Sequence, residues 1–314
     1  MSEQRQPRIG VIGTGAIGGF YGLMLARAGF DVHFLLRSEY QDVKRNGLRV
    51  NHAELGELAL PVVQAWHDVA DMPKCDWLLV GAKTTSNADL AEIINQAAAA
   101  DAKVVLLQNG LAVEDELRPL LTEQVHLLGG LCFICVHRSA PGVIEHEAHG
   151  GVNIGYHSGP ASAIEGAQIA EQAAAMFGKA GLDSKAMAQL QQARWQKLVW
   201  NIPYNGLSVL LNSNTRQLMD EPHSRALVAD LMAEVVQAAA ACGYPLPEHL
   251  VANMLKATDA MPDYWPSMYH DFSHKRPLEL QAIYVAPLAA AGAAGCEMPK
   301  VAMLLQSLEF LSTR

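Results

Sequence analysis

The sequence lacks the features of proteins that cross membranes or bind nucleic acids. No stretch approaches the ~18 apolar residues of a membrane-spanning helix, and the N-terminus has no basic region followed by an apolar one. The net charge is −9, and no run rich in Lys and Arg alternates with aromatic residues. We therefore expect a cytoplasmic protein that has neither a membrane nor a nucleic acid as a partner.

Cysteine is scarce as well. Five cysteines, an odd number, are scattered along 314 residues, which argues against a disulfide framework. Cys132 and Cys135 form a single CxxC within the strand-like LLGGLCFICV, so we expect them to pack in the core. HEAH at 146–149 is one residue shorter than the zinc-binding HExxH and also lies in a strand-like pattern, so no metal site is predicted.

What the sequence does contain is apolar residues, 50% of the total, in a length that suits about two globular domains. Residues 1–187 alternate apolar strands and helical stretches, which predicts an α/β domain of the Rossmann type with a doubly wound parallel sheet. Strand-like segments near 124–136, 143–155 and 182–187 should complete this sheet or extend it antiparallel. Residues 188–314 predict an all-helical second domain, with helices near 189–211, 222–242, 247–259, 278–294 and 299–311.

A glycine motif opens the first domain. Gly13, Gly15 and Gly18 form GxGxxG between an apolar strand and a helical pattern, the context that dinucleotide binding requires. Gly13 permits a tight turn, Gly15 lets the backbone approach a pyrophosphate, and Gly18 lets helix and strand pack closely. The start of the helix, with Ala16 and Ile17, should bind the pyrophosphate through its free N–H groups. A purely structural glycine turn is the alternative.

The end of the next strand, DVHFLLRS at 31–38, distinguishes the two nicotinamide cofactors. NAD-binding folds usually end this strand with an acid for the ribose 2′-hydroxyl, whereas an arginine accommodates the 2′-phosphate of NADP. Asp31 begins the strand and Arg37 stands at its end. This predicts NADP(H) with Arg37 as its clamp, the alternative being that Arg37 is merely solvated.

Polar residues follow two further predicted strands. Lys83 comes after the strand at 76–80, and Asn109 comes after the strand at 103–107. Because ligands of parallel α/β sheets bind at the carboxyl ends of the strands, both side chains should lie at the cofactor edge.

The second domain contributes a row of polar side chains. Lys197, Asn201 and Asn205 recur every four positions in KLVWNIPYN, so a helix would project them from one face of an otherwise apolar segment. Such a row predicts the polar wall of a cleft. The alternative is that the asparagines satisfy backbone groups released by Pro203.

Ser267 and Glu279 are two more polar candidates in the second domain. Ser267 follows DYWP, and Glu279 stands early in a helical pattern. Their ordinary interpretations are an N-cap for Ser267 and a complement to the helix dipole for Glu279.

Taken in order, GxGxxG, LLRS, AKT, QNG, WQKLVWNIPYNGLSVL, PSM and RPLELQAI form a pattern that covers nearly the whole chain. In this pattern the sequence resembles the ketopantoate reductases (2-dehydropantoate 2-reductases). The resemblance implies a Rossmann domain, a helical domain, and NADPH-dependent reduction of 2-dehydropantoate to (R)-pantoate, a step toward pantothenate and coenzyme A. It further implies catalytic roles for Lys197 and Glu279, substrate binding by Asn109, Asn201, Asn205 and Ser267, and positions beside the nicotinamide for Lys83 and Asn109.

The chemistry of these side chains fits the reduction of a carbonyl group. Hydride transfer to a ketone carbon leaves negative charge on the oxygen, which the Lys197 ammonium can stabilise and protonate. Two alternatives stay open. The substrate could be another small branched 2-keto acid, because Tyr264 and Trp265 stand where the family often carries a small polar residue, or the chain could sense NADPH without turnover. The oligomeric state is open too, with a homodimer among the alternatives.

Overall fold

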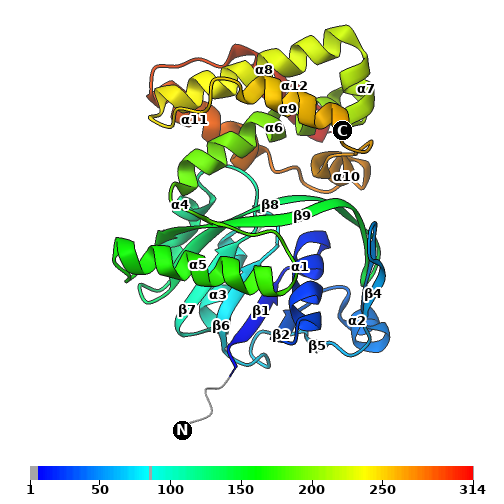
Figure 1. Cartoon of the computed structure of the whole chain (residues 1–314), viewed down its shortest axis with the longest axis vertical. Coiled ribbons are helices and arrows are strands. Elements are labelled where there is room, and N and C mark those ends of the chain that lie inside the picture. The colour runs from blue at the N-terminus through cyan, green and yellow to red at the C-terminus, as the bar shows by residue number, and fades with distance from the viewer. Residues whose placement is uncertain (1–5, 85–86, 314) are drawn as a thin grey trace. The chain divides into compact units, whose positions relative to one another are not determined.

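The computed structural model describes residues 6–84 and 87–313, and its contacts divide the chain into two compact units (Figure 1). Unit 1 comprises residues 1–108 and 113–190, and unit 2 comprises residues 109–112 and 191–314. The boundary predicted at 187 lies close to the division after Leu190. The short excursion of residues 109–112 into unit 2 was not predicted.

The centre of unit 1 is a parallel sheet with the strand order β7-β6-β1-β2-β5. The steps from β1 to β2 and from β6 to β7 run in opposite directions, so right-handed crossovers place the connecting helices α1 and α3 on opposite faces. This confirms the predicted doubly wound arrangement, and its switch point lies between β1 and β6. The elements are β1 (Arg8–Ile12), α1 (Ala16–Arg27), β2 (Asp31–Leu35), β5 (Gln64–Trp66), β6 (Cys75–Val80), α3 (Asn87–Ala97) and β7 (Ala98–Leu106).

A long antiparallel hairpin extends this sheet. Its first strand, β8 (His126–Ala140), pairs in parallel with β7, and its second, β9 (Val143–Ser158), returns antiparallel along β8. β9 also pairs in parallel with β3 (Leu48–His52) and with β10 (Ala186–Met187), while β4 (Gly56–Leu60) pairs with β3. The antiparallel extension was predicted, whereas β3, β4 and β5 were missed because such short strands carry little periodic signal.

α1 is buried on nearly all sides. It packs against the parallel strands, against β3, β4, β8 and β9, and against α5 (Ala163–Lys179), beside which it lies in Figure 1. Its residues from Gly18 to Leu23 are buried without interruption, so the helix needs small or apolar side chains all round, and GGFYGL supplies them. Three shorter helices, α2 (Tyr40–Asn46), α4 (Val113–Leu117) and the 3₁₀ turn η2 (Arg118–Leu120), complete the described helices of unit 1.

Unit 2 is helical throughout its described residues. All five predicted helices are confirmed, the fourth as a π-helix followed by an α-helix, and the short α7 and α10 were missed. No described helix of either unit is long and apolar enough to span a lipid bilayer. The elements are α6 (Leu190–Leu211), α7 (Thr215–Asp220), α8 (Pro222–Ala241), α9 (Leu250–Ala260), α10 (Ser267–Ser273), η3 (Gln281–Val285), α11 (Ala286–Ala293) and α12 (Pro299–Ser312).

The two motifs that resembled metal or redox sites are strands, as expected. Cys132 and Cys135 are buried in β8, and burial, with the charge of Glu147 adding to it, raises the pKa of the Cys135 thiol to about 12. A thiol in this environment stays protonated and is a poor nucleophile. His146 and His149 lie in β9, not on the helix that a zinc-protease motif requires.

Candidate functional site

Glycines shape the turn between β1 and α1. Gly13 has φ +85°, and a Cβ on it would clash with the backbone of Ala82. A Cβ on Gly18 would clash with the carbonyl oxygen of Gly13. Gly15 differs, because no atom of the other described residues, its chain neighbours aside, lies within 4 Å of the place where its Cβ would stand. Gly13 and Gly18 therefore allow the tight turn and the close packing, while the space in front of Gly15 is open to a ligand.

The first turn of α1 suits an anion. Gly15 is the N-cap, no side chain of a described residue caps the helix, and no acidic residue stands in the first turn. The Thr14 hydroxyl turns away from the helix and donates to the carbonyl oxygen of Leu35 at 3.2 Å. The N–H groups of Ala16 and Ile17 stand at positions that have no acceptor within a helix, so the residues present fit a pyrophosphate.

At the end of β2, the exposed Arg37 is the residue that the sequence predicted as a clamp. The two acids of this region are engaged elsewhere. Asp31, at the opposite end of β2, lies 3.2 Å from Nε2 of His33. Glu39 is buried, pairs with Arg138, and accepts a hydrogen bond from the N–H of Gly142 at 3.0 Å.

The loops after β6 and β7 lie together in unit 1. Lys83 follows β6 and is partly exposed, and the side chain of Gln108, after β7, donates to the carbonyl oxygen of Ala82 at 2.9 Å. Asn109, which was predicted at the same edge, belongs by its contacts to unit 2. Its position is therefore set by the helical unit.

Residues 109–112 are fastened to two helices of unit 2. Leu111 N–H donates to the carbonyl oxygen of Ala282 in η3 at 2.9 Å, and Gly110, with φ +109°, packs so closely on Ala282 that a Cβ would clash. The buried Arg194 of α6 donates to the carbonyl oxygen of Gly110 at 3.3 Å. Arg194 and Gly110 hold the segment that carries Asn109, and sequence reasoning missed both.

The polar row lies on α6, as predicted. Lys197 is partly buried, and Asn201 and Asn205 are only 5% and 2% exposed. The buried amide nitrogen of Asn201 has no hydrogen-bond partner among the described residues. Leaving such a group unpaired costs about 1–3 kcal/mol, so a ligand is the expected partner.

Asn205 has a different environment from Asn201. Its side-chain oxygen accepts the N–H of Met268 at 3.2 Å and so caps the first turn of α10. The alternative that Asn205 satisfies a backbone group released by Pro203 is therefore wrong for this side-chain oxygen, although Asn205 does have a protein partner, in a helix 63 residues away. Ser267 is the first residue of α10, and Pro266 is the N-cap, so the N-cap interpretation of Ser267 is wrong.

Glu279 immediately precedes Leu280, the N-cap of η3, and the residue is 5% exposed. An acid that only complements a helix dipole is usually exposed, so the dipole does not explain this burial. In the same helix, Tyr284 donates its hydroxyl to the carbonyl oxygen of Ile202 in α6 at 2.9 Å. Burial raises the pKa of Tyr284 well above its ordinary value, which keeps this donor protonated.

The segments that carry Asn109, Glu279 and Ser267 are each bonded to α6. Arg194 holds the Asn109 segment, Tyr284 holds the helix after Glu279, and Asn205 holds α10 with Ser267. The intervening residues of α6 include Lys197 and Asn201. Unit 2 by itself thus gathers the elements that carry the predicted catalytic and substrate-binding residues, and η3 is a π-helix, a form often found at functional sites.

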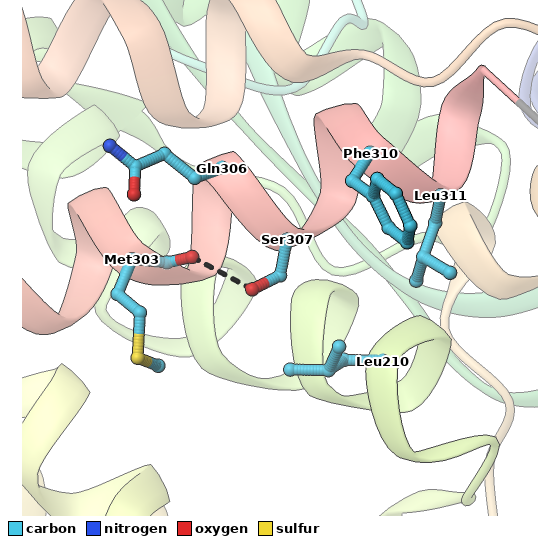
Figure 2. A pocket seen from close by; sticks show the side chains of 6 residues that line it. All are labelled: Leu210, Met303, Gln306, Ser307, Phe310 and Leu311. Carbon is cyan, nitrogen blue, oxygen red and sulfur yellow. Dashed lines mark hydrogen bonds between the residues drawn. The ribbon is translucent and has the colours of Figure 1, made fainter.

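A pocket elsewhere on unit 2 is separate from these residues. It has a volume of about 430 Å³ and lies between α12 and the end of α6 (Figure 2). Its lining is mostly apolar. The hydroxyl of Ser307 donates a hydrogen bond to the carbonyl oxygen of Met303 at 2.9 Å. None of the predicted site residues lines it, so we do not assign the chemistry there. The lining residues are Leu210, Met303, Gln306, Ser307, Phe310 and Leu311.

Comparisons with known proteins agree with this arrangement. A family model described as "Ketopantoate reductase PanE/ApbA" matches residues 9–159, and one described as "Ketopantoate reductase PanE/ApbA C terminal" matches residues 189–312. A protein named 2-dehydropantoate 2-reductase from Nostoc sp. is 42% identical over 304 residues, which cover 97% of this chain and 95% of the relative.

Solved structures are similar over the same length. The crystal structure of a 2-dehydropantoate 2-reductase from Geobacter metallireducens has a TM-score of 0.89 at 39% identity, covering 96% of this chain and 99% of its own. The ternary structure of D-mandelate dehydrogenase with NADH and anilino(oxo)acetate has a TM-score of 0.86 over 98% of both chains. Its identity is 20%, so it shows a shared fold alone.

Proposed function

The chain belongs to the ketopantoate reductase PanE/ApbA family, and we propose from this membership that it reduces 2-dehydropantoate to (R)-pantoate with NADPH. The observation that carries the proposal is the polar row of α6. There the buried amide nitrogen of Asn201, one helical turn from Lys197, has no hydrogen-bond partner in the described part of the chain. A ligand with polar groups would satisfy this amide, and a 2-keto acid offers a carbonyl and a carboxylate.

In the proposed reaction each site residue of unit 2 has a defined task. A nicotinamide cofactor, when bound, would supply hydride chemistry, and the Lys197 ammonium would supply the proton that turns the ketone oxygen into a hydroxyl. Before transfer, the same ammonium stabilises the charge that develops on this oxygen. Four neutral side chains orient the substrate through hydrogen bonds: Asn109, Asn201, Asn205 and Ser267. The Glu279 carboxylate accepts a hydrogen bond from the substrate's hydroxyl group.

NADPH is the proposed cofactor because of the residues at the end of β2. Arg37 is exposed there, and neither nearby acid is available for a ribose 2′-hydroxyl, since Asp31 pairs with His33 and Glu39 with Arg138. The fold alone does not choose between the two dinucleotides, because D-mandelate dehydrogenase shares it and was solved with NADH.

The decisive experiment follows the NADPH absorbance band when 2-dehydropantoate is supplied to the purified protein. We expect NADPH oxidation with a higher kcat/KM for 2-dehydropantoate than for simple branched 2-keto acids such as 2-oxoisovalerate. Equal values would favour the broader 2-keto acid reductase. NADPH binding without oxidation by either substrate would favour the sensing alternative.

The aromatic residues that motivated the broader substrate range have partners inside unit 2. Tyr264 is buried and bonded through its backbone to Thr215, and Trp265 stacks on Tyr269 with ring centroids 3.9 Å apart. The stacking favours a structural role for the Trp265 ring, and the backbone bonds fix the position of Tyr264 within unit 2, so 2-dehydropantoate stays the first candidate substrate.

The proposal also includes a homodimer in the cytoplasm. Met303 and Phe310, which line the same mostly apolar pocket, expose large apolar side chains on unit 2, and exposed apolar patches are typical of protein interfaces. Light scattering on the purified protein tests the dimer, and cell fractionation tests the location. A protein that stays monomeric at all concentrations would contradict the proposed homodimer.

A further inference from the structure

An imidazole stands beside Arg37 beyond the end of β2. β5 runs parallel to β2 with Leu35 opposite Trp66, and the N–H of Leu36 donates to the carbonyl oxygen of Trp66 at 2.9 Å. His67 follows Trp66 in the chain as Leu36 follows Leu35. His67 therefore lies next to Leu36, one residue away from Arg37, and both of these basic side chains are exposed.

Two contacts orient the His67 ring. Its Nδ1 lies 3.3 Å from the carbonyl oxygen of Leu36, and its centroid lies 5.3 Å from the centroid of the Tyr40 ring. A carbonyl oxygen only accepts hydrogen bonds, so Nδ1 carries the hydrogen in this contact. This leaves Nε2, on the other edge of an exposed ring, as the atom that can meet a ligand.

The chemistry of Nε2 depends on a single proton. In the neutral ring with a hydrogen on Nδ1, Nε2 accepts hydrogen bonds, whereas in the imidazolium it donates and the ring is positively charged. The oxygens of a phosphate dianion only accept, so a ring that meets this group has to donate from Nε2. A ribose hydroxyl could instead donate to the neutral ring.

We propose that His67 is a second recognition residue for the 2′-phosphate of NADPH and acts together with Arg37. The proposal rests on NADPH as the cofactor proposed above. Guanidinium and imidazolium would hold the phosphate dianion from two neighbouring strand ends, and binding would place a proton on Nε2 of His67. The affinity for NADPH relative to NADH should therefore fall as the pH rises, because the neutral ring, while its Nδ1–H bonds to the Leu36 carbonyl oxygen, offers no donor at Nε2.

The charged and titratable groups around His67 are compatible with this role. Tyr40 of α2 packs against the ring, and Arg37 follows β2. Asp68, next in the chain, accepts a peptide N–H within its own turn at 2.9 Å, and Glu39 is buried in its ion pair. The two acids nearest along the chain are thus engaged with other groups.

Fluorescence titration of the full-length protein with NADPH and with NADH, at about pH 6 and about pH 8, tests the proposal. For His67→Ala we expect roughly 5- to 20-fold weaker NADPH binding near pH 6, the range of an exposed charge-assisted hydrogen bond. The loss should be smaller near pH 8, and NADH binding should not change. Because a phosphate monoester titrates in the same range, the readout is the difference between wild type and variant at each pH.

His67→Gln is the matched variant. It keeps a side-chain donor at every pH, so its NADPH-to-NADH ratio should vary less with pH than that of the wild type, and a thermal melt shows that it is folded. Equal losses of NADPH and NADH affinity in His67→Ala, or an unchanged ratio, would show that His67 only packs against Tyr40. A wild-type protein that binds NADPH no better than NADH would instead overturn the cofactor assignment itself.

Discussion

Protonation of His146 is expected to destabilise unit 1 at acid pH. The residue is 4% exposed. Its ring stacks on the rings of His52 and of Phe20 in α1, with centroid-to-centroid distances of 3.9 Å and 5.0 Å. Its Nε2 bonds to the carbonyl oxygen of His149 at 2.8 Å and so carries the hydrogen, while the buried Nδ1 has no partner among the described residues. Burial lowers the pKa of His146, and burial with the added charge of His146 lowers the pKa of His52.

The magnitude follows from proton linkage. In the unfolded chain a histidine has a pKa of about 6.5. The lowered pKa in the folded state means that the unfolded state binds more protons, so the stability is present above about pH 6.5 and is lost as the pH falls. If His146 stays neutral in the folded protein, its contribution to this loss is about 1.4 kcal/mol at about pH 5.5 and near zero at about pH 7.5. Phe20 connects this site to α1, the proposed pyrophosphate-binding helix.

Urea unfolding followed by circular dichroism, at about pH 7.5 and about pH 5.5, measures this loss. His146→Phe keeps a ring against Phe20 but cannot be protonated. Between the two pH values its free energy of unfolding should therefore fall by up to about 1.4 kcal/mol less than that of the wild type. The loss of the hydrogen bond to His149 lowers the free energy of unfolding by the same amount at both pH values, so it cancels in this difference. His249→Phe, at an exposed position of unit 2, is the control and should behave as the wild type. The same acid loss in wild type and His146→Phe would refute the reasoning.

The remaining predictions concern the proposed site. Lys197→Ala should lower kcat by about 10²- to 10⁴-fold with nearly unchanged NADPH affinity, because it removes the proton donor, and unchanged turnover would contradict that role. Gln196→Ala, at the exposed neighbouring position, is its control. Arg37→Ala should weaken NADPH binding by about 10-fold or more in a fluorescence titration and leave NADH binding intact, and equal losses would contradict the clamp. Asn205→Ala should raise KM and lower stability by about 1 kcal/mol, because the N–H of Met268 loses its acceptor. Asn205→Asp keeps the acceptor but repels the substrate carboxylate, so steady-state kinetics should show a raised KM in a stable protein; an unchanged KM would leave Asn205 with a structural role alone.

Periodicity predicted the elements whose apolar pattern is long. The turn at Gly13 to Gly18 and the helices α1, α6, α8 and α12 were all expected close to where they lie. α5 was missed although its start carried a readable signal. Ser162 and Glu165 form a capping box, in which the hydroxyl accepts the N–H of Glu165 and the carboxylate accepts the N–H of Ser162. The spacing S-x-x-E before a helical pattern would have predicted this helix.

The parts of the site that sequence reasoning missed depend on contacts between residues far apart in the chain. Arg194 and Gly110 are separated by 84 positions, and nothing local to either residue indicates the other. The buried charge of Arg194 could be inferred only once α6 and the 109–112 segment were known to touch. Asn109 illustrates the consequence. Its place after a strand predicts a position at the cofactor edge of the sheet, but gives no hint that its contacts would place it in the helical unit.

The two asparagines of α6 show most clearly where a helical period stops being informative. Asn201 and Asn205 have the same spacing, the same apolar flanks and nearly the same burial. Asn205 bonds to a backbone N–H 63 residues away, which no pattern within α6 encodes. Asn201 keeps a buried donor that no residue in 6–84 or 87–313 satisfies, and a protein retains such a cost where a ligand offsets it. The period thus identifies the face of the helix, while the unpaired amide identifies the position on that face where the substrate is expected to bind.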